Sequence, residues 1–407
     1  MTPLTEAPPT HGAPASPLRM IGVVCAAHFV SHYYIIILAP LLPFVRADYG
    51  VSYTEIGLAL TVFNIVSTVL QTPAGFLIDR LGARLLLVAG LALGGVAFLL
   101  AGLVNSFWFL IAMFALAGIG NTVYHPADYA LLSRHVPAQR IGQAFSIHTF
   151  SGVLGAAVAP PTLLLMQSVW GWRGAFIGAG IMGLVIAAAV LMVRENTSTM
   201  AAPKPRAGGD GKPASWNLLL SPPILLNLVF FLLLALMNSG MNNYSVAALG
   251  ALYGTPAAIA NTALTAMLLL SSIGVLVGGV LVGRTALHSI VAALGVAGAA
   301  LSAALIGTFD FATFALIAVM AAQGFSTGII APSRDMIVRA ATPEGSFGKV
   351  FGFVSTGFNL GGIVAPMIFG ALMDAGNPRL VFFGVAAAAL IAILTVVTLP
   401  KRSREAV

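Results

Sequence analysis

The stretch "NTVYHPADYALLSRH", residues 121–135, places ionisable side chains at the end of a long apolar run. Asn121, His125 and Asp128 lie at i, i+4 and i+7, so a helix puts all three on one face. An imidazole and a carboxylate on one face can contact a polar substrate or carry a proton. Pro126 has no N–H and leaves one carbonyl of the preceding turn without its helical partner, so we expect a bend there.

Further imidazoles occur in two other apolar runs of the sequence. His28 and His32 are four residues apart and share a helical face, and His148 lies in a later run. We interpret them as candidates for substrate contact or proton transfer, with structural hydrogen bonds between helices as the alternative. Tyr33 and Tyr124 stand beside them as further candidates. No metal site is expected at the first pair, because no further ligand cluster accompanies it in the sequence.

Polar side chains also interrupt the apolar runs of the second half of the chain. The amides of Asn238, Asn242 and Asn359 predict either substrate contacts or hydrogen bonds between helices. Gln323 and Arg334 fall on one stripe of another predicted helix. All of these residues are therefore candidates for the substrate site.

Arg334 has three possible roles. It can pair with Asp128 across a cytoplasmic gate, or it can bind an anionic substrate. It can also pair with the adjacent Asp335 or extend its charged end to the membrane interface.

Composition places the chain in a lipid bilayer. Of 407 residues, 59% are hydrophobic and only 8% are charged, whereas soluble domains carry about 25% charged residues. The single cysteine, Cys25, excludes an internal disulfide. The first 18 residues are polar and Pro-rich, and we expect a disordered cytoplasmic tail there.

Segments of about 20 apolar residues predict membrane-spanning helices, because a bilayer tolerates only helices and closed barrels. Strands of a barrel would alternate in polarity, and these segments do not. The expected spans are 20–45, 54–78, 84–104, 107–133, 141–168, 173–193, 218–250, 256–282, 287–308, 311–338, 347–373 and 379–399. The fold class is therefore an all-α membrane protein of twelve transmembrane helices.

A Pro-, Gly- and charge-rich segment divides the spans into two sets of six. We expect a six-helix bundle at 19–195, a cytoplasmic linker at 196–217, a second bundle at 218–400 and a tail at 401–407. Fifteen of the 19 basic residues fall on the side of the termini and three on the other, with Arg334 within or at the edge of a span. This asymmetry predicts cytoplasmic termini. It also accounts for the net charge of +7, so no nucleic-acid partner is expected.

The two sets are internal repeats. A shift of 206 residues superposes prolines, glycines and an arginine in constant register. The matched pairs include Pro126 with Pro332, Pro137 with Pro343, Gly155 with Gly361, Pro160 with Pro366, and Arg173 with Arg379. Parallel repeats of this kind predict two pseudo-symmetric bundles with a transport pathway between them.

The segment "GFLIDRLGARLLL", 75–87, resembles the loop 2–3 signature of the major facilitator superfamily, with Ala83 as one extra residue. The corresponding segment of the second half, "GGVLVGRTAL" at 278–287, has Gly283 where the acid would stand. The resemblance implies the major facilitator fold and a charge relay that latches the cytoplasmic side. It assigns signature or gating positions to Asp79, Arg80, Arg84, Asp128 and Arg284.

Two segments, "SHYYIIILAPLLP" and "YHPADYALLSR", resemble the fosmidomycin-resistance branch of drug exporters. The leading function is therefore proton-coupled export of a small polar or drug-like compound by alternating access. The alternative is proton-coupled uptake of a small organic anion of the carboxylate type, and a non-transporting membrane receptor is a distant third.

We expect no enzymatic activity, because no nucleophile, base and orienting residue converge in the sequence. No Walker A motif is present, so ATP does not drive the protein directly. No cofactor is expected. The expected partners are a small-molecule substrate, protons and the lipid bilayer, with the protein acting as a monomer in the inner membrane.

Overall fold

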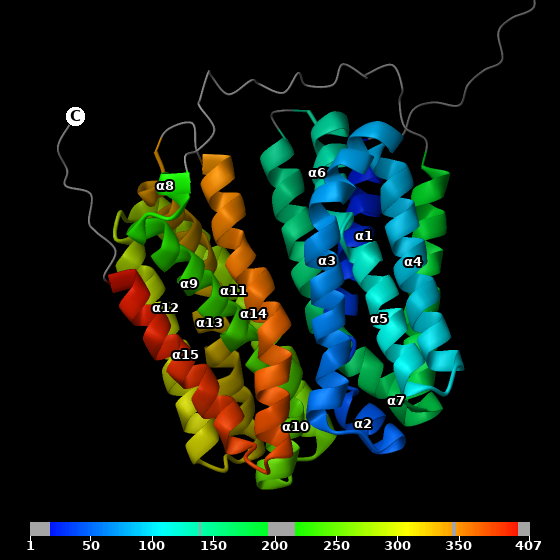
Figure 1. Cartoon of the computed structure of the whole chain (residues 1–407), viewed down its shortest axis with the longest axis vertical. Helices are drawn as coiled ribbons and strands as arrows, with labels where there is room; N and C mark the ends of the chain where they lie inside the picture. The colour runs from blue at the N-terminus through cyan, green and yellow to red at the C-terminus, as the bar shows by residue number, and fades with distance from the viewer. Residues whose placement is uncertain (1–16, 138–139, 194–215, 344–346, 398–407) are drawn as a thin grey trace, which may run out of the picture.

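The computed structural model describes residues 17–137, 140–193, 216–343 and 347–397, and within them it contains helices and no strand. Figure 1 shows two helical bundles side by side, one from each half of the chain. The first comprises α1 (Pro17–Ile36), α2 (Leu42–Tyr49), α3 (Tyr53–Leu81), α4 (Ala83–Leu103), α5 (Phe107–Asn121), α6 (Tyr124–His135) and α7 (Ile141–Met192).

The second bundle contains a short π-helix, η2, in addition to α-helices. Its elements are α8 (Trp216–Leu219), α9 (Pro222–Ser239), η2 (Gly240–Tyr244), α10 (Ser245–Tyr253), α11 (Ala257–Arg284), α12 (His288–Thr308), α13 (Thr313–Ala341), α14 (Phe347–Asp374) and α15 (Arg379–Val397). The predicted tails and linker lie almost entirely outside the described residues, so their boundaries stay predictions.

Eleven described helical segments are long and apolar enough to cross a membrane. The expected spans 141–168 and 173–193 both lie within α7, as two helices that meet at a kink, so these eleven segments accommodate the twelve expected spans. Gly171 joins them with φ 70° and ψ 172°, and a glycine tolerates this positive φ without strain.

Three expected spans are interrupted where proline or polar residues weaken the helix. Span 20–45 is broken between α1 and α2, where Pro43 occupies the first turn of the new helix. Span 107–133 is broken at residues 122–123, as Pro126 predicts. Span 218–250 contains the π-helix η2 in the run "GMNNY".

Helix bounds confirm the internal repeat. The starts of α5 and α13, Phe107 and Thr313, are 206 residues apart, and so are the ends of α6 and α13, His135 and Ala341. The starts of α7 and α14 follow the same shift. Each half therefore repeats one arrangement of helices, and Asp128 and Arg334 occupy equivalent positions.

The halves meet through α3 against α14 and through α7 against α11. The hydrogen bonds that join the halves between described residues all lie toward the start of α3 and the end of α14. The Thr61 hydroxyl donates to the Ile363 carbonyl at 3.0 Å, and the Asn64 amide donates to the Gly362 carbonyl at 3.1 Å. Toward the other end the two bundles diverge (Figure 1).

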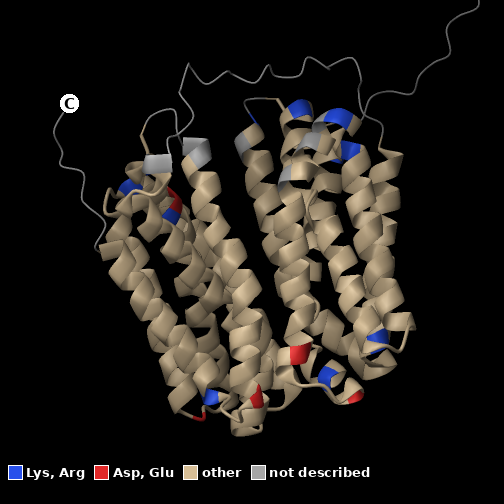
Figure 2. Ribbon diagram, in the orientation of Figure 1, with Lys and Arg blue, Asp and Glu red and all other residues tan. Residues whose placement is uncertain are grey.

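Charged residues mark the two ends of the bundles. In Figure 2, arginines gather at the end where the bundles diverge, and acidic residues are mixed with arginines at the end where they meet. The apolar surfaces between these ends form a band suited to the hydrocarbon core of a bilayer.

Candidate functional site

A cluster of imidazoles surrounds one buried carboxylate inside the first bundle. The carboxylate of Asp128, on α6, lies 3.0 Å from Nε2 of His148 on α7 and 3.3 Å from Nδ1 of His28 on α1. The contact with His148 is a hydrogen bond, whereas the His28 nitrogen is close without hydrogen-bond alignment. Asp128 is fully buried, and both histidines are at most 3% exposed.

Two more histidines extend this His–Asp cluster. The ring of His28 stacks on that of His148 with centroids 3.8 Å apart. His32 and His125 lie 4.6 and 5.1 Å from His28 by the same measure. His125 is exposed and His32 is half-buried, so the cluster runs from an accessible edge to a buried carboxylate.

Gly152 provides the space for this packing. A Cβ atom at this position would lie 2.5 Å from Cδ2 and Nε2 of His28 and 3.0 Å from Cδ2 of His32. α7 can therefore approach α1 closely enough to bring His148 onto Asp128 only because residue 152 has no side chain.

The cluster retains unused hydrogen-bonding capacity. Oδ1 of Asp128, Nδ1 of His148 and Nε2 of His32 are buried without a hydrogen-bond partner among the described residues. No arginine or lysine of the described residues pairs with Asp128. A buried carboxylate without a permanent cation is costly as an isolated anion, and sharing a proton with the imidazoles lowers that cost. The arrangement is suited to taking up and releasing a proton.

The distances also allow metal coordination to be considered. One donor atom each from His28, Asp128 and His148 lies within 4.8 Å of the others. Oδ2 of Asp128 and Nε2 of His148 already bond each other directly at 3.0 Å. We therefore interpret the trio as a hydrogen-bonded cluster.

Other candidates of the first half contribute to packing in this conformation. The hydroxyl of Tyr33 bonds the Thr162 hydroxyl at 2.9 Å, and that of Tyr124 donates to the Gly90 carbonyl at 3.3 Å. Asn121 ends α5 before the helix break and donates to the Ser67 hydroxyl at 3.4 Å. The break thus separates Asn121 from the face that carries the histidines.

The loop 2–3 signature ties two helix ends together. The guanidinium of Arg84, at the start of α4, donates to the carbonyls of Val190 and Leu191 in the last turn of α7. A cation at the carboxyl end of a helix satisfies free carbonyls and favours the helix dipole. Arg80 is exposed, and the side chain of Asp79 lies outside those that the structure describes.

Arg334 does not meet Asp128 in this conformation. Its Nε and Nη2 atoms lie 2.9 and 2.8 Å from one oxygen of Asp335. Its guanidinium carbon lies 4.7 Å from the ring centre of Phe231 on α9 and 5.1 Å from that of Phe358 on α14. Asp128 instead points toward α1 and α7, where imidazoles are available as partners.

The remaining candidates are dispersed over the second half. Gln323 is buried, Asn242 and Asn359 are half-buried, and Asn238 is exposed. Arg284 is exposed at the end of α11. The sequence-based analysis missed a carboxylate that joins the halves: Asp374 accepts hydrogen bonds from the backbone amides of Tyr53 and Thr54 at 2.6 and 2.7 Å. The capping box at Ser52 predicts where α3 begins, but no local pattern identifies a partner so distant in sequence.

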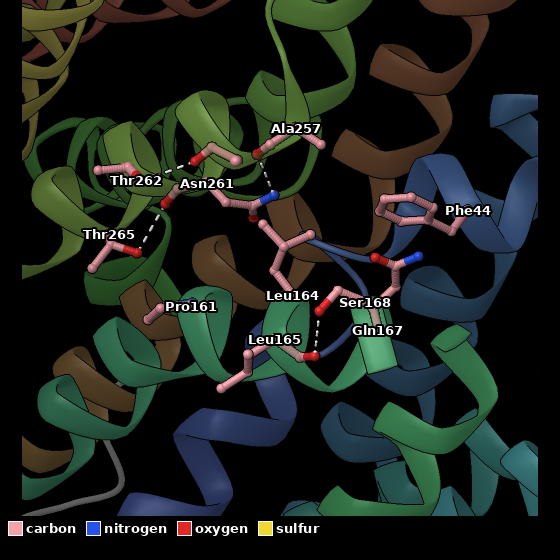
Figure 3. A pocket seen from close by; sticks show the side chains of 11 residues that line it. Phe44, Pro161, Leu164, Leu165, Gln167, Ser168, Ala257, Asn261, Thr262 and Thr265 are labelled. Carbon is pink, nitrogen blue, oxygen red and sulfur yellow. Dashed lines mark hydrogen bonds between the residues drawn. The ribbon is translucent and has the colours of Figure 1, made fainter. Parts of the chain in front are cut away.

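A pocket of about 570 Å³ lies between the halves, lined by residues of α7, α11 and α2 (Figure 3). Its polar side chains are largely engaged by their own helices. Asn261, Thr262 and Ser168 donate to the carbonyls three or four residues earlier. None of the predicted site residues lines this pocket, so we do not assign it to a polar substrate.

Comparison with known proteins identifies relatives among bacterial transporters. A probable L-galactonate transporter of Escherichia coli K12 is 32% identical over 152 residues, which is 37% of this chain and 34% of the relative. A probable sulfoacetate transporter of Cupriavidus necator is 28% identical over 166 residues, or 40% of this chain and 38% of the relative. The matched segments thus span little more than a third of these relatives.

A fosmidomycin resistance protein of E. coli K12 is 23% identical over 236 residues, covering 56% of this chain and 58% of the relative. A solved structure of a mutant nucleoside transporter, NupG, has a TM-score of 0.76 at 15% identity and covers 94% of this chain and 100% of its own. A bacterial homologue of the human lysosomal transporter Spinster, inward-facing and unoccupied, has a TM-score of 0.75 at 15% identity and covers 95% of each chain.

The sequence profile of the Major Facilitator Superfamily matches residues 24–253 and again 228–407, so it covers nearly the whole chain. The two bundles, the 206-residue repeat and the structural neighbours agree with this match. The chain belongs to the Major Facilitator Superfamily and is a multi-pass membrane transporter, not an enzyme.

Proposed function

We propose that this protein is a secondary transporter that moves a small organic anion together with protons by alternating access between its two halves. The substrate class rests on the relatives named for L-galactonate and sulfoacetate, both of which are acids. Proton coupling rests on the His–Asp cluster. The observation that carries the proposal is the buried Asp128 carboxylate held between two imidazoles with one oxygen unused.

Every element packed around Asp128 bears on its protonation. α1 contributes Cys25, His28 and His32, and α7 contributes His148. α6 itself contributes Tyr124, His125 and Tyr129. α3 and α4 also contact α6, and the described side chains of these two helices place no charged group against the carboxylate. Imidazoles are thus the principal groups that exchange a proton with Asp128.

A route for the proton follows from the exposure of the rings. His125 is exposed, and its ring packs edge-on against that of His28 with the ring centres 5.1 Å apart. His28 in turn lies within 3.3 Å of Asp128. Protons enter through His125 and reach Asp128 by way of His28.

The orientation in the cell membrane belongs to the same proposal. The excess of basic residues on the side of the termini favours cytoplasmic termini. With that orientation the bundles diverge toward the cytoplasm (Figure 1), as an inward-facing transporter requires. A fluorescent protein fused after Val407 should fold in the cytoplasm, and alkaline phosphatase fused within 252–255 should be active in the periplasm. The reverse pattern would overturn the orientation.

The test of coupling uses purified protein in liposomes, with L-galactonate and sulfoacetate as probes. Wild type should accumulate the anion when a pH gradient is imposed and should also exchange it without a gradient. Asp128→Asn removes the titrating oxygen while keeping the shape of the side chain. It should abolish accumulation and keep exchange.

Asp310→Asn is the matched control, because Asp310 is an exposed acid of the second half and lies far from the cluster in the chain. It should behave as wild type. Full gradient-driven accumulation by Asp128→Asn would overturn the proton site. Loss of wild-type transport on adding EDTA would instead assign the cluster to a metal ion and would equally overturn it.

Proton-linked export of a drug-like compound is the second candidate. It is favoured by the resistance protein, which matches a larger share of the chain than the two acid transporters named above. Expression in a host that lacks its own efflux pumps distinguishes the two. Raised fosmidomycin resistance supports export, and growth on galactonate as the sole carbon source supports uptake.

A further inference from the structure

Arg334 lies within a spanning helix of the second half, and its surroundings are unlike those of a surface residue. Arg334 lies seven residues before the end of α13, and its side chain is only 18% exposed. An arginine within a span usually faces the bundle interior or a water-filled space and marks a functional site. Its contacts on α9 and α14 indicate which interior it faces.

Two aromatic rings hold the guanidinium in place. Phe231 and Phe358 lie 4.7 and 5.1 Å from its central carbon, and the two rings meet at 67° with centroids 5.0 Å apart. Phe358 precedes Gly362, the residue on α14 that still bonds the first half, by about one turn of helix. Arg334 therefore packs against α14 about one turn from the residue through which that helix bonds the first half.

The acidic partner of Arg334 uses only some of the hydrogen-bond donors of the guanidinium. Asp335 engages Nε and Nη2 through the single oxygen Oδ1. A guanidinium has five N–H donors and can bind a carboxylate through two parallel bonds, so it retains donors for a second anion. The Asp335 side chain is 46% exposed. Its carboxylate can therefore leave Arg334 and become hydrated when a substrate anion binds the guanidinium.

We infer that Arg334, flanked by Phe231 and Phe358, is the subsite for the acid group of the transported anion, and that Asp335 occupies this subsite when no substrate is bound. The inference rests on the proposed function, because it takes a carboxylate or sulfonate as the ligand. The acid group of the incoming anion takes the place of the Asp335 carboxylate. The partly buried guanidinium therefore always has a negatively charged partner.

Asp335 then acts as a competitor built into the chain. Removing its charge frees the guanidinium for the substrate, so a loss of charge should tighten binding. If the Arg334–Asp335 pair were purely structural, removing the charge of Asp335 would disturb the binding site and weaken substrate binding. A gate residue predicts changed transport rate at constant affinity.

The experiment measures binding of L-galactonate and of sulfoacetate to the purified full chain by calorimetry. Asp335→Asn should lower the Kd of the anion about threefold or more, and Arg334→Gln should raise it at least about tenfold. Arg334→Lys should bind weakly, because an ammonium lacks the planar pair of donors. Asp310→Asn should leave the Kd unchanged.

Several outcomes separate this subsite from the proposed function. Equal binding by wild type and Arg334→Gln would overturn the subsite and leave anion transport standing. Weaker binding by Asp335→Asn, with unchanged unfolding temperature, would overturn the competitor role. Wild type that binds neither anion would overturn the substrate class and the subsite together.

Discussion

Asp374 in the second half caps the first turn of α3 in the first half. One of its carboxylate oxygens accepts hydrogen bonds from both the backbone amide of Thr54, at 2.7 Å, and the Thr54 hydroxyl, at 2.5 Å. The other carboxylate oxygen accepts the amide of Tyr53. Gly370 lets the helices approach so closely that a Cβ there would lie 2.8 Å from Cα of Thr54. A charged cap thus closes the end of the transporter opposite the linker.

Removal of this cap should shift the protein toward the state that is open at that end. Asp374→Ala loses a helix cap worth about 0.5–2 kcal/mol, which corresponds to a population change of roughly 2- to 30-fold. Spin labels at the exposed positions 47 and 375, in a Cys25→Ala background, should report longer distances. Asp310→Ala, an exposed acid between α12 and α13, is the control. An unchanged distance distribution in Asp374→Ala would exclude a latching role.

The space at residue 152 should be essential to the His–Asp cluster. Gly152→Ala pushes a methyl group into the rings of His28 and His32, and overpacking of this kind costs about 1–3 kcal/mol. We expect a lower unfolding temperature and loss of pH-driven transport. Gly279→Ala is the matched control, because a Cβ there meets nothing within 4 Å. If Gly152→Ala transports normally, the rings can move apart without functional cost.

His125 should affect the rate of proton entry more than the extent of coupling. His125→Gln removes the exposed imidazole at the edge of the cluster while Asp128 and His148 remain paired. Pre-steady-state uptake after a pH jump should slow, and the final accumulation should stay near that of wild type. His135→Gln serves as control, because His135 lies on the same helix and its ring bonds the Leu131 carbonyl of that helix, outside the His–Asp cluster. Equal rates in the two variants would remove His125 from the proton route.

The signature arginine should stabilise the fold by capping α7. Arg84→Gln leaves the carbonyls of Val190 and Leu191 without their partner and should lower stability by about 1–2 kcal/mol. The unfolding temperature in detergent should fall for Arg84→Gln and stay unchanged for Arg80→Gln, because Arg80 is exposed. A similar fall in both variants would point to a general effect of charge.

The elements and their repeat could be predicted from the sequence because the signals are local. Apolar length gives the spans, and the register of Pro126 with Pro332 gives the repeat. The way in which two successive spans connect was harder to predict from the sequence. Gly171 turns the chain while helical hydrogen bonding continues on both sides, and composition does not distinguish this from a loop.

The candidate site was predictable only within single helices. Helical spacing identifies His125 with Asp128 and His28 with His32, but it cannot bring His148 of a third helix onto Asp128. That contact depends on the approach of α7 to α1 at Gly152. Arg334 illustrates the same limit, because its aromatic neighbours come from α9 and α14.

The equivalent positions of Asp128 and Arg334 have a consequence for the membrane potential. In the proposed cycle, a proton neutralises the acid of one half while a monovalent anion joins the arginine of the other, so the loaded and empty carriers bear the same net charge. Moving one elementary charge through 100 mV would involve about 2.3 kcal/mol, and this transporter would avoid that term in both directions. In that proposed cycle, one proton per monoanion would make transport electroneutral, so the pH gradient alone would set the accumulation of a monovalent acid, whereas a divalent acid would carry current.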